Sequence, residues 1–168
     1  MTELIEIRDP VEALKSTFRR HASGVAIITT VGTDGSPIGF TATSVTSLGA
    51  TPPLVSFNVA RGSSSWHALS TTTHVAIHTL GEENLELAKR MADDHTKRFA
   101  VDDWKTGVHG LPIFENTTSV LVVRVLQIVN VENNAVMIGA VESGLLGVEQ
   151  SALLYHQRAY VAPGKTLS

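Results

Sequence analysis

Apolar residues recur along the chain at two periods, one helical and one typical of β-strands. Residues 9–12, Asp-Pro-Val-Glu, predict a helix start, because Asp can accept the free amides of a first turn and Pro suits the first helical position. Val11, Leu14 and Phe18 follow at helical spacing. A second helix is predicted over 82–92, where the sequence reads EENLELAKRMA. Long helices therefore occupy only a small part of the chain.

Most of the remaining pattern is that of short strands separated by turn residues. Asp34-Gly35 predicts a hairpin turn, because both residues tolerate positive φ. Pro52-Pro53 separates two further strands, and the serines of 63–71 predict the start of a short helix. The predicted strands are 24–31, 37–47, 54–60, 74–80, 118–132, 135–146 and 153–161.

These elements predict a mainly β fold, a closed antiparallel barrel with a few peripheral helices. A chain of 168 residues can bury one sizeable core, so we expect a single domain over 1–168 with its core at about 10–162. Residues 93–116 are polar and irregular. Such a stretch in a small domain is usually functional, for example a lid, or it covers an edge of the core.

Charge and composition exclude several classes of protein. The net charge is −3, with 13 basic and 16 acidic residues spread evenly, so no basic face is available for nucleic acid or an anionic membrane. Cys is absent, which excludes disulfides and thiolate metal sites and suits a reducing compartment. The first residues lack a signal-peptide pattern and no apolar stretch reaches membrane-spanning length. We expect a cytoplasmic protein without a membrane or nucleic-acid partner.

The sequence does not support two common kinds of functional site, a Rossmann dinucleotide site and a two-histidine metal site. The GxGxxG fingerprint of a Rossmann dehydrogenase is absent. His74 and His78 would share a metal on a helix, but on a strand four steps place them about 13 Å apart. We therefore expect half-exposed strand histidines and no metal site.

The segment 58–66 is a candidate anion cradle. A strand ends, an Arg and a Gly follow, and three hydroxyls precede a short helix, an arrangement that suits a phosphate. A solvated Ser-rich cap with an exposed Arg is the alternative. The residues concerned are Asn58, Arg61, Gly62, Ser63, Ser64 and Ser65.

The segment 39–47 is a second candidate, with five hydroxyl residues in the seven positions 41–47. Strands favour Thr, so an exposed β face is one explanation. Hydroxyl donors beside small residues are also suited to a flat heteroaromatic ring lying against the backbone. The two segments together favour a site for a phosphorylated ring compound.

Several loose motifs, in a specific order, resemble the flavin reductase-like family over nearly the whole domain. The resemblance implies an FMN-binding split β-barrel, usually a homodimer, like the reductase components of two-component flavin monooxygenases. The motifs are Phe18-Arg19-Arg20, 24–30, Asp34-Gly35, 39–44, 52–54, Arg61-Gly62-Ser63, Phe99-Ala100, 110–112, 138–141 and 154–160.

The resemblance also implies roles for single residues. It implies that Phe99, His156 and Tyr160 border the nicotinamide, where an imidazole or a phenol orients the carboxamide or stabilises charge on reduced flavin. For His156 and Tyr160, an ordinary structural role is the alternative. By similarity, the flavin would be lined by Gly39, Thr41, Ala42, Thr43 and Ser44, and its ribityl chain and phosphate would be held by Asn58 and 61–65.

One departure concerns nicotinamide binding. Many members of the family carry Gly-Asp-His at the hairpin before the Ile138-Gly139 strand, where this chain has Glu132-Asn133-Asn134. Asn keeps hydrogen bonds but carries neither a proton nor a positive charge, so this departure affects nicotinamide binding more than flavin binding.

The leading hypothesis is an NAD(P)H-dependent flavin reductase that transfers hydride to FMN or FAD and supplies reduced flavin to a monooxygenase component. The alternative is a flavin-binding carrier or sensor without reductase turnover, and a haem or other tetrapyrrole binder is a third possibility. The sequence does not distinguish binding of FMN from binding of FAD, or use of NADH from use of NADPH. It also does not identify a monooxygenase partner.

Overall fold

The computed structural model of the protein describes residues 4–167 and contains twelve strands among them. The helices are α1 (Pro10–Arg20), α2 (Trp66–Leu69) and α3 (Leu85–Ala92), with the 3-10 helices η1 (Glu82–Asn84) and η2 (Val108–Gly110). The strands are β1 (Ser23–Gly24), β2 (Ala26–Val31), β3 (Pro37–Ala42), β4 (Thr46–Ala50), β5 (Pro53–Ala60), β6 (His74–Thr79), β7 (Lys105–Thr106), β8 (Pro112–Ile113), β9 (Ser119–Val131), β10 (Asn134–Leu146), β11 (Leu154–His156) and β12 (Ala159–Val161).

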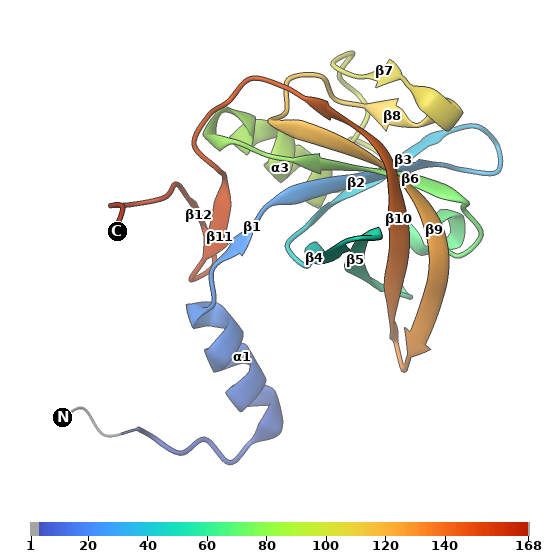
Figure 1. Ribbon diagram of the computed structural model, residues 1–168. Helices are drawn as coiled ribbons and strands as arrows, with labels where there is room; N and C mark the ends of the chain where they lie inside the picture. The colour runs from blue at the N-terminus through green and yellow to red at the C-terminus, as the bar shows by residue number, and fades with distance from the viewer. Residues whose placement is uncertain (1–3, 168) are drawn as a thin grey trace.

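The predicted mainly β class is confirmed. Seven strands form one antiparallel sheet in the order β3-β2-β6-β9-β10-β5-β4, while β1-β11-β12 and β7-β8 form two small sheets (Figure 1). The edge strands of the large sheet are β3 and β4. Within residues 4–167 no backbone pairing joins these two edges, so the pairing does not confirm a closed barrel.

The long β9–β10 hairpin bends around the core. Register shifts occur between Ile138 and Gly139 and between Val141 and Ser143, the sites of irregular pairing with β9. A Cβ at Gly139 would lie 2.3 Å from Val123 Cγ1 and 2.9 Å from the Arg124 carbonyl oxygen. Only glycine fits this close approach, and bulges of this kind bend and twist a strand.

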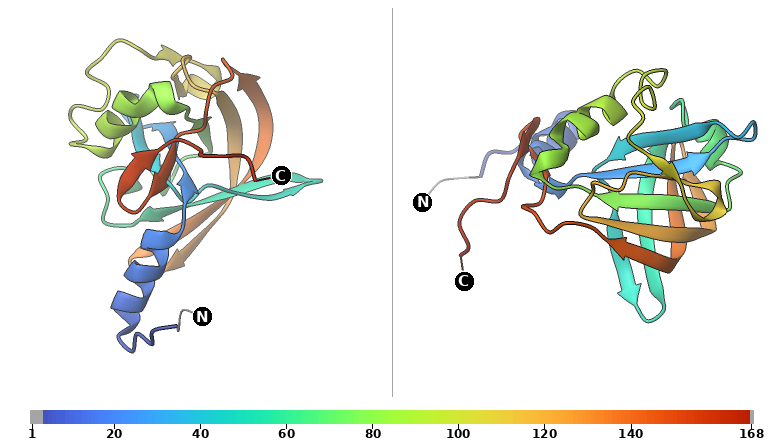
Figure 2. Two further views of the ribbon diagram at one scale, coloured as in Figure 1. Left: turned by 90° about the vertical axis from the view of Figure 1, so that its left-hand side faces the viewer. Right: turned by 90° about the horizontal axis from the view of Figure 1, so that it is seen from above.

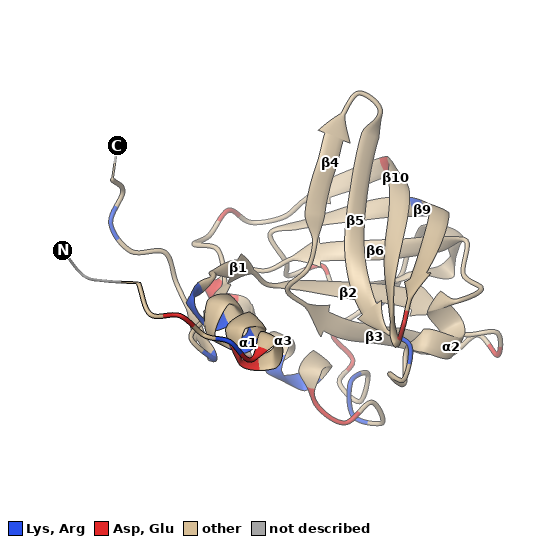
Figure 3. Ribbon diagram, turned by 90° about the horizontal axis from the view of Figure 1, so that it is seen from below, with Lys and Arg blue, Asp and Glu red and all other residues tan. Residues whose placement is uncertain are grey.

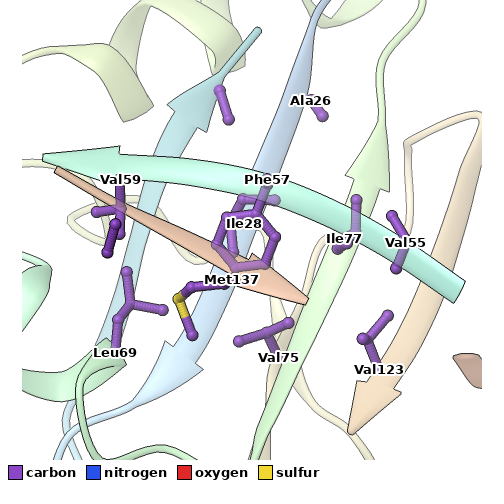
Figure 4. Packing of buried hydrophobic residues seen from close by; sticks show 12 residues of the cluster. Ala26, Ile28, Val55, Phe57, Val59, Leu69, Val75, Ile77, Val123 and Met137 are labelled. Carbon is purple, nitrogen blue, oxygen red and sulfur yellow. The ribbon is translucent and has the colours of Figure 1, made fainter. Parts of the chain in front are cut away.

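The inner face of the large sheet packs against itself. Phe57 of β5 lies across Ile28 of β2, and Met137 of β10 fills the space beside them (Figure 4). These side chains belong to one buried cluster, which places β2 and β5 on facing sides of the core although three strands separate them in the sheet order. The large sheet is therefore strongly curled.

The irregular segment after α3, residues 93–116, covers the outer face of the sheet, whereas the sequence predicted either a functional segment or a cover for an edge of the core. Leu111 and Ile113 are buried in a cluster with Ala76 of β6 and two valines of β9. Arg90 of α3 holds the middle of the segment by donating two hydrogen bonds to the Asp103 carboxylate, at 2.8 and 2.7 Å. These contacts hold the segment against the outer face of the sheet.

Three local predictions need correction. The predicted strand over 37–47 breaks at residues 43–45, where the Ser44 hydroxyl oxygen accepts a hydrogen bond from the Asn58 amide. The predicted helix over 63–71 shortens to α2, and Ser65 at its start makes no side-chain cap hydrogen bond. The predicted strand over 153–161 is a hairpin, because Gln157 and Arg158 adopt positive φ and turn the chain between β11 and β12.

The first helix forms as predicted but stands away from the sheet (Figures 1 and 2). The Asp9 carboxylate accepts hydrogen bonds from the amides of Val11 and Glu12, at 2.8 and 3.2 Å. No residue of α1 is buried. Charged residues gather on α1, on α3 and on the segment after α3, whereas the strands carry few of them (Figure 3).

No helix within residues 4–167 combines the length and the apolar character needed to cross a lipid bilayer.

The sequence predicted half-exposed histidines on β6, and this is wrong for His78, which is fully buried. The irregular segment 93–116, called the covering segment from here on, places the Phe114 backbone amide 3.1 Å from His78 Nε2. The Ile27 carbonyl oxygen lies 3.2 Å from Nδ1. Because an amide can only donate, Nε2 accepts and the ring proton lies on Nδ1. Burial lowers the pKa of His78 from 6.5 to about 4, so the ring is neutral at pH 7.

Folding stability should therefore fall as the pH drops through the window from 6.5 to about 4, because the unfolded chain binds a proton at His78 that the folded protein does not. The loss approaches about 3 kcal/mol at the acid end of the window. Urea unfolding of the wild type and of His78→Gln across this range should show a stability difference that shrinks with falling pH. The exposed His67→Gln serves as control, and parallel pH profiles for the wild type and His78→Gln would contradict the assignment.

Candidate functional site

A surface cavity of about 390 Å³ lies between β3, the end of α3 and the loop after β5. This volume lies within the range of small-molecule sites, about 300–1,000 Å³. Seven residues predicted to bind the flavin line it: Thr41, Ala42, Thr43, Ser44, Asn58, Ser63 and Ser65. The two predicted segments, 39–44 and 58–65, thus meet at one cavity.

Some hydroxyl groups of this cavity take part in hydrogen bonds within the protein, and others are free to donate to a ligand. Thr41 Oγ1 donates to the Ala88 carbonyl oxygen at 2.6 Å and so ties β3 to α3. Ser44 Oγ accepts a hydrogen bond from the backbone amide of Asn58 at 2.9 Å, which leaves the Ser44 hydroxyl proton free to donate. Thr43 and Ser63 are exposed. Thr41 therefore anchors the wall, while Thr43, Ser44 and Ser63 can offer hydrogen bonds to a ligand.

Arg98 is a lining residue that the sequence reasoning missed. Its Nη1 donates to the Gly39 carbonyl oxygen at 2.9 Å and lies 3.5 Å from both Ser64 Oγ and Ser65 Oγ. Among the residues that the structure describes, no carboxylate lies within ion-pair distance of Arg98. A half-buried cation facing hydroxyls without a counter-ion suits an anionic ligand such as a phosphate.

Desolvation lowers the pKa of Arg98, while the charges of Asp94 and Asp93 act in the opposite direction. An arginine remains protonated despite such a shift, so its positive charge is available at neutral pH. The only signal in the sequence was a basic residue in the irregular segment after α3. Its distance along the chain from both candidate segments hid its place at the cavity.

Gly39 and Phe99 border a small hollow that adjoins the main cavity and shares Ser65 and Arg98 with it. A Cβ at Gly39 would lie 2.7 Å from Met91 Cε and 3.1 Å from Phe99 Cζ. The space beside Gly39 is therefore filled by these two side chains. The absence of a side chain at Gly39 serves packing between β3 and α3.

Arg61 and Gly62 do not line this cavity. The Arg61 guanidinium donates to the Glu132 carbonyl oxygen at 2.9 Å and lies 5.8 Å from the centre of the Trp66 ring. A cation–π contact and a backbone hydrogen bond together hold the side chain at the tip of the β9–β10 hairpin. The predicted cradle is thus divided, with Ser63 and Ser65 at the cavity, Ser64 at the adjoining hollow and Arg61 outside both.

The predicted catalytic pair lies on the β11–β12 hairpin, apart from the residues that line the cavity. Tyr160 pairs with Tyr155 across the hairpin, and its ring packs edge-on at 5.3 Å between ring centres. His156 borders a hollow beside α1, with Nε2 3.2 Å from the Arg20 carbonyl oxygen. Burial raises the pKa of the Tyr160 phenol, with a further contribution from Tyr155, so it stays protonated at pH 7.

Asn134 lies close to the cavity wall. It pairs directly with Ala60, as Val136 pairs with Asn58, and both Ala60 and Asn58 line the cavity. Directly paired residues of antiparallel strands point to the same face of a sheet. Asn134, at the position where many members of the family have His, therefore lies beside the cavity wall but is not one of its lining residues.

A cation without a carboxylate partner, free hydroxyls and an amide side chain lie at one cavity of a curled β-sheet, an arrangement that suits a phosphorylated small molecule. The family model for the flavin reductase like domain matches residues 18–164. An NADH:FMN oxidoreductase from Rhodococcus erythropolis is 38% identical over 154 residues, which cover 89% of this chain and 80% of that protein.

Two further relatives agree. The reductase subunit of a flavin-dependent monooxygenase from Mycobacterium tuberculosis is 30% identical over 162 residues, which cover 94% of this chain and 86% of that protein. The crystal structure of a flavin reductase domain protein from Arthrobacter sp. FB24 matches with a TM-score of 0.89 and 46% identity, covering 93% of this chain and 97% of that one.

The chain belongs to the flavin reductase like domain family, which confirms the resemblance seen in its sequence. The names of these relatives also confirm the predicted activity class, an NAD(P)H:flavin oxidoreductase. The predicted flavin and nicotinamide cofactors agree with the same names.

Replacing Arg98 should weaken FMN binding more than replacing Arg61. Loss of a charge-assisted hydrogen bond costs about 1.5–3 kcal/mol, so Arg98→Gln should raise the Kd for FMN about 10- to 100-fold, while Arg61→Gln changes it less than about twofold. Fluorescence titration measures both. Riboflavin, which lacks the phosphate, is the control ligand and should bind wild type and Arg98→Gln alike. A larger loss with Arg61→Gln, or an equal loss for riboflavin, would contradict the assignment of the phosphate to Arg98.

Proposed function

We propose that this protein is an NAD(P)H-dependent flavin reductase that passes a hydride from the nicotinamide to FMN or FAD bound in the cavity between β3, α3 and the loop after β5. The observation that carries the proposal is Arg98, a half-buried cation without a carboxylate partner, facing Ser65 at that cavity and Ser64 at the adjoining hollow. Membership of the flavin reductase like domain family supports the choice of ligand.

The residues of the cavity take distinct roles in this proposal. Arg98, Ser64 and Ser65 bind the phosphate of the flavin by charge-assisted and neutral hydrogen bonds. Thr43, Ser44, Asn58 and Ser63 donate hydrogen bonds to the ribityl chain and to the polar edge of the ring system. Thr41 keeps the wall in place through Ala88. When bound, the flavin supplies the ring that accepts the hydride.

The nicotinamide side involves a different set of residues. Asn134 orients the carboxamide through hydrogen bonds, because it pairs with Ala60 at the edge of the cavity. Phe99, at the adjoining hollow, limits the depth to which a second ring can enter. His156 and Tyr160 lie outside the cavity wall, so we assign them a bordering role that depends on a second copy of the chain.

A flavin carrier or sensor without turnover is the second candidate, and Asn134 is the observation in its favour. An amide at this position cannot carry the charge that an imidazole supplies. Both candidates bind flavin in the same cavity. Oxidation of the nicotinamide nucleotide separates them, because only the reductase consumes it.

The purified protein should oxidise NADH or NADPH when FMN or FAD is present, and absorbance at the nicotinamide band measures this directly. All four pairings need testing, with protein omitted as the control. Arg98→Gln should raise the KM for FMN about 10-fold or more, because its effect falls on phosphate binding. Flavin binding without nucleotide oxidation in any pairing would favour the carrier, and absence of both would end the proposal.

We further infer that residues 1–168 act as one domain, a closed split barrel whose β3 and β4 edges approach each other. The buried cluster shared by β2, β3, β5 and β10 supports this inference, since it draws both halves of the sheet around one core. The family match over 18–164 spans the same core. Reduced nicotinamide nucleotides are cytoplasmic substrates, and we place the protein there, with a monooxygenase component as recipient of reduced flavin.

We also infer a homodimer, in which a second copy covers α1. Val11, Leu14 and Phe18 form the apolar face of this helix and are 59%, 61% and 62% exposed. A contiguous apolar face of this kind marks an interaction surface. Contact through α1 would also bring a second chain to the hollow that holds His156.

Leu14→Glu should convert the dimer to a monomer, because it places a charge in the apolar face of α1. Size-exclusion chromatography with light scattering gives the mass of each species. Ser16→Glu, on the opposite side of the helix, is the matched control and should remain dimeric. A monomeric wild type, or a Leu14→Glu variant that stays dimeric, would contradict the inference.

A further inference from the structure

Three potential metal ligands from distant parts of the chain meet on the outer face of the large sheet. His74 is the first residue of β6, His109 lies in η2 of the covering segment, and Glu142 lies on β10. Their ligand atoms all lie within 4.8 Å of one another. The sequence reasoning tested His74 only against His78, four residues away on the same strand, and so did not find this group.

The spacing of these atoms fits a tetrahedral ion. Glu142 Oε2 lies 3.3 Å from His74 Nε2 and 3.5 Å from His109 Nε2. Ligands about 2.0–2.2 Å from a zinc ion at tetrahedral angles are about 3.3 Å apart, so both pairs already have the separation of two ligands on one ion. The imidazole rings are stacked, with 3.8 Å between their centres and an angle of 16° between their planes. Because the Nε2 lone pair lies in the plane of its ring, coordination of one ion by both histidines requires the exposed His109 ring to rotate out of the stack.

Neighbouring groups orient two of the three ligands. His74 Nδ1 is hydrogen-bonded to Thr73 Oγ1 at 3.0 Å, which leaves Nε2 as the coordinating atom. Arg124 Nε donates to Glu142 Oε1 at 3.0 Å, which leaves Oε2 directed at the histidines. Hydrogen bonds from outer groups to ligating imidazole and carboxylate are typical of built metal sites.

The two imidazoles coordinate an ion only through an unprotonated Nε2, so binding of the ion releases any proton held there.

An ion can reach this group without passing the flavin cavity. His74 and His109 line a surface hollow of about 240 Å³ together with threonines of β2 and of the loop before β6. No residue lines both this hollow and the cavity that contains Arg98. The two sites are thus separate on the surface.

We propose that His74, His109 and Glu142 form a binding site for one divalent transition-metal ion, with Zn²⁺ as the best-fitting species. Two imidazoles and one carboxylate are the borderline and hard ligands that zinc and its neighbours accept, and they leave a fourth position for water. The ion links the covering segment, β6 and β10 at one point. Its role is to fix the covering segment, and it takes no part in hydride transfer.

Isothermal titration of the EDTA-treated full-length protein with Zn²⁺ tests the proposal. One equivalent should bind, and His109→Asn and Glu142→Gln should each weaken binding at least about tenfold, because each removes a ligand. Asn tolerates the positive φ of 58° at His109, so the backbone there is kept. Thr73→Val should weaken binding about 10- to 100-fold through loss of the orienting hydrogen bond. Mg²⁺, which favours oxygen ligands, should not bind at the same concentrations.

The exposed His67→Asn is the matched control and should bind Zn²⁺ as the wild type does. Zn²⁺ should also raise the Tm of the wild type and of His67→Asn but not that of His109→Asn. Titration in two buffers of different ionisation enthalpy should show proton release on binding. Absence of a stoichiometric site, or an equal loss with His67→Asn, would overturn the proposal and leave the group as a hydrogen-bonded His-Glu cluster. Flavin binding is measured separately, so failure here leaves the proposed reductase activity untouched.

Discussion

The curl of the large sheet is the constraint on which the rest of the structure depends. Gly139 permits β10 to approach Val123 and the Arg124 carbonyl of β9 more closely than any side chain allows. The bulges there bend the long hairpin, and its curvature turns the inner face of the sheet upon itself. Burial of Phe57 against the β2 side of the core then holds the curl in place.

The candidate flavin site is a consequence of this curl. The bend at 43–45 and the loop after β5 are brought together because β3 and β5 lie on facing sides of one core. The Ser44–Asn58 hydrogen bond closes the contact between them. The loop after β5 contains Arg61, but its guanidinium binds the Glu132 carbonyl oxygen outside the cavity. Arg98 supplies a positive charge from the covering segment, which Arg90 and Asp103 hold against the body of the protein. The proposed phosphate-binding role thus combines groups from three separate parts of the chain.

Local features of the fold were readable from the sequence, because neighbouring residues determine them. The cap at Asp9, the turn at Asp34-Gly35 and the β9–β10 hairpin all form as predicted. Contacts between distant residues were not readable. No pattern in the sequence indicates that the Asn58 backbone amide donates to Ser44 Oγ, where the predicted strand ends. None indicates that His78 is buried with its Nε2 accepting from the Phe114 backbone amide. The candidate site was predicted only in part for the same reason. Both hydroxyl-rich segments are recognisable in the sequence. Arg61 is the cation closest to them along the chain, whereas Arg98 is the cation at the cavity in the folded protein.

The histidines of β6 show how one covering segment produces opposite chemistry at two positions on the same face of a strand. At His78 the segment is apolar, its Phe114 amide occupies Nε2, and burial keeps the ring neutral. At His74 the segment is polar and open to solvent, and it brings His109 beside Glu142 of β10, within reach of Nε2. A buried ring with both nitrogens hydrogen-bonded has no lone pair left for an ion, whereas His74 keeps one. The covering segment, and not the strand, therefore decides which histidine is structural and which is available to a metal.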